Sequence, residues 1–149
     1  MAHAGSDLLC YRTQGPSGLV KSQEQHWDPV LDWAKAALGA PLFLAESIVH
    51  VAQPEASLER LKEALVGCDA FSLAALHVMT ALSGSALLAL AVAHRRLTAE
   101  EAWAAAHVDE DWQIRQWGED AEAAVRRKNG WRDFEAAAQT LALAQDGAS

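Results

Sequence analysis

The sequence from Ala70 to Ala93, AFSLAALHVMTALSGSALLALAVA, contains no aspartate, glutamate, lysine or arginine. Such a stretch is long enough to span a bilayer, but a Ser-Gly-Ser turn at residues 83–85 lies in its middle. We therefore predict two buried helices joined by a tight turn, and no stable membrane insertion. The second helix, residues 85–96, is apolar on nearly every side, so it should lie in the centre of the core. His77, in the first helix, is expected to be a core histidine with its ring nitrogens hydrogen-bonded.

The composition of the whole chain also favours helices. About one residue in five of the 149 is alanine, which is the best helix former and a poor strand former. Apolar residues make up 51% of the chain, which is typical of a globular protein, and the length suits one domain. The net charge of −8 repels phosphate backbones, so a general nucleic-acid-binding function is excluded.

Residue types that carry chemistry do not occur at the spacings that metal or catalytic sites need. Cys10 and Cys68 are too few and too far apart for a zinc ribbon, a thioredoxin-type motif or a disulfide scaffold, and both thiols are expected to be reduced. His107 and Glu110 lie three residues apart, but the ferritin-like Glu-x-x-His pattern is absent. No glycine-rich phosphate loop and no nucleophile with its base is recognisable. The sequence therefore predicts no enzymatic activity, no metal and no cofactor.

Helix-start and helix-stop signals divide the first half of the chain. Asp28 followed by Pro29 predicts the start of an amphipathic helix that ends at Gly39. Ser57 and Asp69 are expected to cap the next two helices. Residues 7–12 suit a strand or a helix end, and residues 42–52 suit an extended segment or a short helix.

The C-terminal third is expected to contain three helices. Thr98, with Glu101 three residues later, forms a capping box that opens a helix to about residue 106. Asp109 can cap a longer helix through residue 127 or beyond, and the Asn129-Gly130 pair is expected to end it. A last helix then covers residues 131–144.

These elements predict an all-α fold, a compact orthogonal bundle of five to seven helices. The predicted domain covers residues 6–144. A tag-like or disordered N-terminus is expected at residues 1–5, and a frayed tail at residues 145–149.

Negative charge and tryptophan are concentrated in residues 98–122. This segment contains eight acidic residues, Arg115 as its one basic residue, and the tryptophans Trp103, Trp112 and Trp117. Acidic side chains beside tryptophan suit recognition of a partly apolar, partly basic protein surface, because tryptophan offers a large rigid contact area. The alternative is a solvated acidic face whose tryptophans pack inward, and the composition of the segment does not decide between the two.

On a helical wheel, Glu110 heads an apolar stripe of the predicted helix, formed by Ile114, Trp117, Ala121 and Val125. Two interpretations of Glu110 are open. It is either a first-turn carboxylate stabilised by free backbone N–H groups, or a carboxylate facing a groove in which a partner supplies a hydrogen-bond donor. Trp112 falls on the opposite side, where it either packs under another helix or is exposed for binding. Gly118, in mid-helix, indicates close approach of another backbone.

At these residues the sequence resembles a known family. The motif DEDWQ at residues 109–113, followed by WGEDAE at residues 117–122, is similar to the signature of the ATP synthase assembly chaperones that attend the α subunit, the ATP-twelve family. Further matching segments occur in the same order and spacing: residues 6–12 (SDLLCYR), Trp27-Asp28-Pro29 with Trp33, the turn at residues 83–85, and Leu97 before the capping box. The resemblance extends from Ser6 to about Ala142.

The resemblance implies a role in the assembly of ATP synthase. Family members have a smaller β-rich N-terminal domain before the helical one, so this chain is expected to be the helical portion of a larger two-domain protein or a variant without the rest. The family chaperone binds the unassembled α subunit of the F1-ATPase and keeps its apolar interface from aggregating. It leaves when the β subunit takes its place, so nucleotide hydrolysis is not expected.

The resemblance also links the acidic position of the DEDWQ motif to function, and here that position is Glu110. The candidate partner-binding residues are Glu110, Asp109, Gln113, Trp112 and Trp117. The counter-interpretation is that these residues hold the helical domain together. The expected partner is the F1 α subunit, and the chain is expected to be monomeric, in a bacterial cytoplasm or a mitochondrial matrix. Two other function classes stay open: a helical module that dimerises through its apolar helices, and an accessory domain of a larger enzyme.

Overall fold

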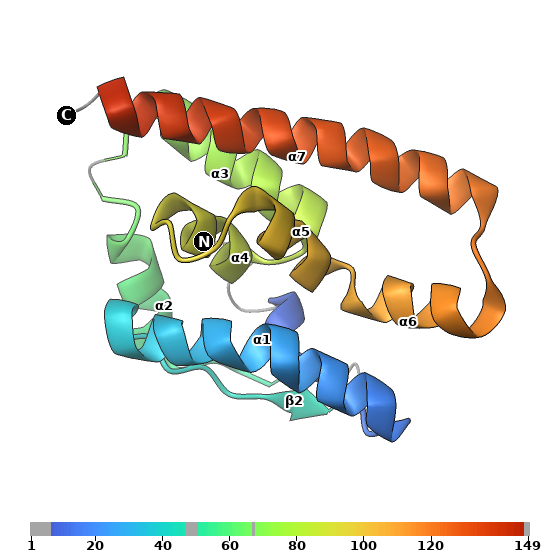
Figure 1. Ribbon diagram of the computed structural model, residues 1–149. Coiled ribbons are helices and arrows are strands. Elements are labelled where there is room, and N and C mark those ends of the chain that lie inside the picture. The colour runs from blue at the N-terminus through green and yellow to red at the C-terminus, as the bar shows by residue number, and fades with distance from the viewer. Residues whose placement is uncertain (1–6, 47–50, 67, 148–149) are drawn as a thin grey trace.

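The computed structural model describes residues 7–46, 51–66 and 68–147. Within these residues the chain forms seven α-helices, one short 3-10 helix and a two-stranded parallel sheet, so the predicted all-α fold is confirmed (Figure 1). In chain order the elements are η2 (Leu8–Cys10), β1 (Tyr11–Arg12), α1 (Ser17–Leu38), β2 (Ala45–Glu46), α2 (Glu55–Glu63), α3 (Ala70–Ser83), α4 (Ala86–Ala93), α5 (Ala99–Ala106), α6 (Val108–Trp117) and α7 (Ala121–Gly147).

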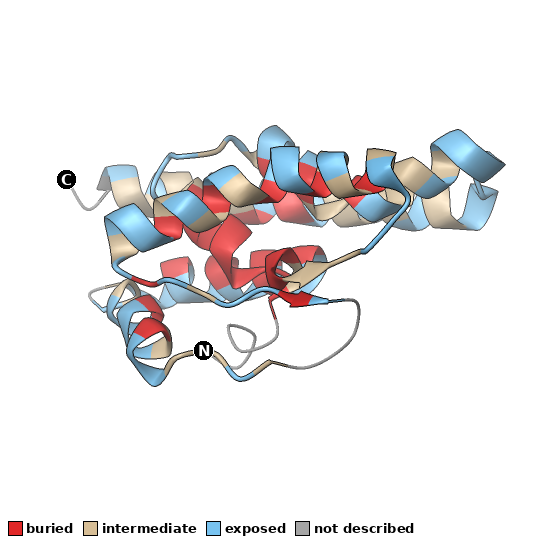
Figure 2. Cartoon of the chain, turned by 90° about the horizontal axis from the view of Figure 1, so that it is seen from below, coloured by how far each residue is buried: buried red, intermediate tan, exposed pale blue. Residues whose placement is uncertain are grey.

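The charge-free stretch forms α3 and α4, joined by a turn at Gly84 with a φ of 77°, as predicted. Residues 86–91 of α4 are all buried, and α4 contacts α1, α3, α5 and α7. Buried residues accordingly gather in the middle of the molecule, between the helices (Figure 2). No helix in the described ranges is long and apolar enough to cross a membrane. The helix α4 is therefore the centre of the core.

His77 is exposed, so the prediction of a core histidine is wrong. The side of α3 that faces the core carries Ala75, Leu76, Met79 and Thr80, and position 77 lies between these on the solvent side. Because that outer side of α3 is itself apolar, the surroundings of residue 77 in the sequence look like a core.

The helix α1 begins at Ser17, eleven residues before the predicted start at Asp28. Pro16 precedes its first turn, and Pro29 lies inside the helix. A buried stripe passes through the proline without a break: Leu19, Gln23, Trp27, Val30 and Ala34. Proline at either position is compatible with a helix start. Pro29 removes one backbone hydrogen bond from the longer helix, and burial of this stripe offsets that cost. The predicted stop at Gly39 is confirmed, with a φ of 65°.

Of the three helix caps predicted next along the chain, one is wrong and two are confirmed. Ser57 lies inside α2, which begins after Pro54, and its hydroxyl donates a hydrogen bond to the carbonyl oxygen of Pro41, so the predicted cap is wrong. Asp69 caps α3 as predicted, because its carboxylate accepts from the N–H of Ser72 at 2.7 Å. The capping box of Thr98 and Glu101 at α5 is also confirmed.

Gly118 and Gly130 have the opposite roles to those predicted. Gly118 has a φ of 86°, and a Cβ at this position would meet no heavy atom of the described residues within 4 Å, so it ends α6 instead of admitting a neighbouring backbone. Gly130 lies inside α7, where a Cβ would come within 3.0 Å of the Trp103 ring, so it provides the close approach. The predicted helix from residue 109 to residue 127 is thus broken at 118, and α7 runs without a break to Gly147, past the predicted end at 144.

The two segments whose structure the sequence left open, near residues 7–12 and 42–52, contribute the two strands of the small sheet. Residues 8–12 form η2 and β1, with Asp7 as the N-cap of η2. Ala45–Glu46 form the extended β2, with Tyr11 opposite Ala45. The predicted tag-like N-terminus, residues 1–5, lies outside the described residues.

Asp7 connects the start of the chain to the N-terminus of α4. Its side chain is buried, and its two oxygens accept hydrogen bonds from the N–H groups of Leu9 and Leu87, both at 3.1 Å. These bonds lower the pKa of the carboxyl group, but burial is the larger effect and raises the pKa from 3.8 to about 6.

We expect Asp7→Asn to flatten the pH dependence of folding stability between about pH 4 and about pH 6. The unfolded side chain loses its proton near 3.8, whereas the folded one keeps it up to about 6. The folded protein binds more protons in this window, so its free energy of unfolding falls as the pH rises, by roughly 2–3 kcal/mol. Urea denaturation at a series of pH values measures this slope. Asp69→Asn, at an exposed helix cap, should keep the slope, and an equally steep slope in Asp7→Asn would contradict the assignment.

Candidate functional site

The acidic motif lies in the first turn of α6, which follows α5 directly at His107. Asp109, Glu110 and Asp111 all occupy this turn, where free backbone N–H groups stabilise negative charge by about 0.3–1 kcal/mol. The predicted cap at Asp109 is therefore displaced by two residues. The helix α6 packs against α1, and a short turn joins it to α7 at one end of the molecule (Figure 1).

Asp109 and Trp112 face α1 and hold α6 in place. The side-chain amide of the buried Gln23 donates to the Asp109 carboxylate at 2.8 Å, while its oxygen accepts from the N–H of Thr13 at 3.0 Å. The Trp112 ring lies over Gly18, where a Cβ would come within 2.6 Å of it. Of the two roles open for Trp112, packing under another helix is the one found in the structure.

Glu110, Gln113 and Trp117 lie on the other side of α6 and line a groove between α6 and α7. The groove has a volume of about 400 Å³, and its remaining lining residues are Ile114, Gly118, Glu119, Asp120, Ala123, Ala124 and Arg127. The predicted stripe through Glu110, Ile114 and Trp117 therefore exists. It does not continue along one helix to Val125, because α6 ends at Trp117. Trp117 is 83% exposed, so this large apolar side chain is not part of the core.

The charge of this groove is mostly negative. Its cation, Arg127 of α7, forms a double hydrogen bond with Asp111 of α6, the longer of the two being 3.4 Å. This bond raises the pKa of Arg127, and the nearby carboxylates of Glu110 and Glu119 raise it further. Arg127 is thus neutralised by Asp111, while Glu110, Glu119 and Asp120 leave an excess of negative charge along the groove.

Glu110 is half-buried near the junction of α5 and α6. Its carboxylate lies 3.8 Å from Nε2 of His107, and Nδ1 of His107 is 2.7 Å from the carbonyl oxygen of Trp103. Glu110 therefore lies in the first turn of a helix, as the first interpretation expects, and it also lines a groove. Whether a partner supplies a hydrogen-bond donor there stays a prediction.

Comparisons with known proteins find relatives that are described as chaperones. The family model described as ATP12 chaperone protein matches residues 1–35. The structure of the Atu1473 protein, a putative chaperone from Agrobacterium tumefaciens, is similar over 94% of this chain, with 50% identity and a TM-score of 0.90. Atp12 from Paracoccus denitrificans is similar over 96% of this chain, with 35% identity and a TM-score of 0.92. The chain belongs to the ATP12 chaperone family. The resemblance found in the sequence is thereby confirmed.

The chain spans only part of these relatives. It covers 53% of the Atu1473 protein and 61% of P. denitrificans Atp12. An aspartate-to-lysine mutant of the P. denitrificans protein is similar to the same extent, with 34% identity over 96% of this chain and a TM-score of 0.92. The helical fold of the ATP12 family member described here therefore corresponds to somewhat more than half of each relative.

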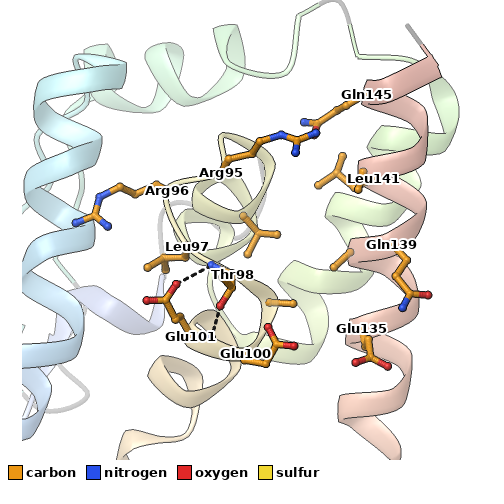
Figure 3. A pocket seen from close by; sticks show the side chains of 14 residues that line it. Arg95, Arg96, Leu97, Thr98, Glu100, Glu101, Glu135, Gln139, Leu141 and Gln145 are labelled. Carbon is orange, nitrogen blue, oxygen red and sulfur yellow. Dashed lines mark hydrogen bonds between the residues drawn. The ribbon is translucent and has the colours of Figure 1, made fainter. Parts of the chain in front are cut away.

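A second pocket, which the sequence did not indicate, lies between the α4–α5 turn and α7 (Figure 3). Charged side chains of both signs surround it, and several already have intramolecular partners. Glu101 belongs to the capping box with Thr98, and Arg95 pairs with Asp146 at 3.0 Å. Gln145 donates to the carbonyl oxygen of Ala93 at 2.7 Å. The pairs Arg95–Asp146 and Gln145–Ala93 join α7 to the end of α4 and the turn that follows it.

No group of three or more potential metal ligands occurs among the residues that the structure describes. Both cysteines are free, and burial raises the pKa of the Cys10 thiol to about 12. A thiol with this pKa stays protonated at neutral pH and is a poor nucleophile.

The turn at Gly118 fixes the angle between the two walls of the groove. We expect Gly118→Ala to reduce the free energy of unfolding by about 1–3 kcal/mol, because its φ and ψ lie in a region open essentially to glycine alone. The dihedrals concerned are a φ of 86° and a ψ of 172°. Urea denaturation checks this, with the exposed Gln116→Ala as the control that should change little. Equal stability of both variants would show that the turn adopts another conformation.

Proposed function

We propose that this chain is a chaperone for assembly of the F1 part of ATP synthase. In this proposal it binds the unassembled α subunit and prevents its aggregation until the β subunit replaces it. The proposal is supported by membership of the ATP12 family. The observation that indicates where the partner binds is the exposed Trp117, which lines the negatively charged groove between α6 and α7 together with Glu110.

The groove has the properties of a protein-binding surface. Tryptophan is enriched among the residues that contribute most to protein–protein affinity, and burial of its large side chain on binding is favourable. The flanking carboxylates favour a partner surface with positive charge and speed the encounter with it. An exposed subunit interface that contains apolar and basic residues would fit this groove.

The five candidate residues are proposed to divide into two roles. Glu110, Gln113 and Trp117 line the groove and are proposed to contact the α subunit directly. Asp109 and Trp112 are engaged with α1 and are proposed to position α6. Substitutions in the second pair would therefore reduce folding stability and binding together, whereas those in the first set would reduce binding with little effect on folding.

The test is to mix the chain with isolated F1 α subunit and to follow light scattering during heating, together with co-elution in size-exclusion chromatography. Both measurements are made with the chain alone and with the β-rich domain of a longer family member added. We expect less aggregation of the α subunit and a joint elution peak, with an unrelated acidic protein as the control. No effect in either setting would contradict the proposal.

A second candidate function, a dimerising helical module, is favoured by the outer face of α3. Phe71 is 73% exposed there and lines an apolar groove between α3 and α7 with Val78 and Leu82. Light scattering at increasing protein concentration distinguishes the two candidates. The chaperone proposal expects a constant monomer mass. A mass that rises with concentration in the wild type, but not in Phe71→Ser, would favour the dimerising module.

A further inference from the structure

Trp117 offers an aromatic face that the described part of the chain leaves unused. The side chain is 83% exposed, and no described ring or arginine stacks on it. Glu119 and Asp120 follow it in the turn to α7 and line the same groove. Glu110 lies on the same side of α6. The groove therefore combines one open tryptophan with three carboxylates.

The same chain shows one arginine bound by a tryptophan together with a carboxylate, and a second arginine that stacks on a tryptophan. Arg12 lies over the ring of Trp27 at 5.4 Å and pairs with the carboxylate of Asp28 at 2.7 Å. Arg115 lies over the ring of Trp112 at 5.7 Å. A guanidinium group is attracted to the negative face of an indole ring, and a carboxylate at the ring edge adds a directed hydrogen bond. Trp117 has the ring and the carboxylates but, within the described residues, lacks the arginine.

The arginine that lines the groove, Arg127, does not lie over the Trp117 ring. Arg127 of α7 forms two hydrogen bonds with Asp111 of α6. Its guanidinium group is not among those that lie over a tryptophan ring. Because no described arginine lies over Trp117, this ring is available to a cation of another molecule.

We infer that the groove between α6 and α7 accepts an arginine side chain of the bound protein, with its guanidinium group on the Trp117 ring and its N–H groups directed to the carboxylates of Glu119 and Glu110. This inference rests on the proposed function, because it names the chemistry of the partner at the same site. The partner residue next to the arginine is apolar and packs on Ile114, Ala123 and Ala124, which supply the apolar lining of the groove. Arginine fits better than lysine, because its planar group both stacks on an aromatic ring and forms paired hydrogen bonds with carboxylates.

The test compares three chains for affinity to isolated F1 α subunit: the wild type, Trp117→Phe and Trp117→Leu. Phenylalanine keeps a weaker aromatic face, whereas leucine keeps apolar volume only. We expect the affinity for the α subunit to fall about 3-fold for Trp117→Phe and about 10-fold or more for Trp117→Leu. Leu143→Ala, at a side chain of 73% exposure on α7, is the control and should bind as the wild type does. All variants should keep the wild-type melting temperature.

The electrostatic part is tested by Glu119→Gln, measured at about 50 mM and about 300 mM NaCl. We expect weaker binding at low salt and a smaller loss of affinity on adding salt than in the wild type. On the partner side, overlapping peptides of the α subunit that bind the chain should lose affinity when an arginine is replaced by citrulline, its uncharged analogue.

The outcomes separate this inference from the proposed function. If the wild type does not bind the α subunit, the proposed function fails and the inference fails with it. If the wild type binds and Trp117→Leu binds equally well, only the inference is overturned. Equal losses for phenylalanine and leucine, with no effect of citrulline, would show an apolar contact without an arginine and would also overturn it.

Discussion

Glu110→Lys is expected to abolish binding to the F1 α subunit, with a loss in affinity of about 100-fold or more. The substitution reverses the charge at a half-buried position of the groove, 3.8 Å from His107 and close to Arg127. The folding cost should be small, about 1 kcal/mol, because the side chain is partly exposed and a first-turn carboxylate contributes about that much to helix stability. Isothermal titration with the α subunit and urea denaturation measure the two effects separately.

The matched control for Glu110→Lys is Glu24→Lys, which makes the same change of charge at an exposed position of α1. It should bind the α subunit with an affinity close to that of the wild type. A loss of more than about 2 kcal/mol in the unfolding free energy of Glu110→Lys, with binding lost only in proportion, would favour a structural role for Glu110.

Trp103→Ala is expected to reduce the free energy of unfolding by about 3–5 kcal/mol, the largest effect on folding that we predict. Trp103 is 8% exposed, and its ring lies 5.1 Å from that of Phe134 and 6.0 Å from that of Trp131, both on α7. It also contacts His107, at the junction with α6, with ring centres 4.2 Å apart. Removal of the ring leaves a cavity between α5 and α7 and loosens the start of α6.

The comparison for this prediction is Trp117→Ala, the same chemical change at a tryptophan of 83% exposure. Its unfolding free energy should stay within about 0.5 kcal/mol of the wild type, while its binding to the α subunit falls. Thermal and urea denaturation of both variants check the contrast. Similar losses of stability in the two variants would mean that Trp117 packs against the rest of the chain in solution.

The core could be predicted because its signals are local. A stretch without charges gives α3 and α4, and a serine, glycine and serine give the turn between them, regardless of the rest of the chain. The cap at Asp69 and the capping box at Thr98 likewise depend only on the next three residues.

The errors arise where a residue's role depends on a distant part of the chain. Gly130 is tolerated within α7 because it makes room for Trp103, which lies 27 positions earlier. Trp112 packs inward because Gly18 of α1 leaves space for its ring, while Trp117, five positions further on, stays exposed. The motif alone therefore identified the candidate site, but the division of its residues between packing and binding required the position of α1.

Site-specific photo-crosslinking at Gln113 asks whether the groove between α6 and α7 is where the α subunit binds. Gln113 is exposed and lines the groove, so a benzoylphenylalanine placed there should not disturb folding. The control position is Lys21, exposed on α1. We expect a crosslink to the α subunit from position 113, none from position 21, and loss of the crosslink when the β subunit is added. A complex with the α subunit that crosslinks from position 21 and not from position 113 would show that the groove is not the binding site.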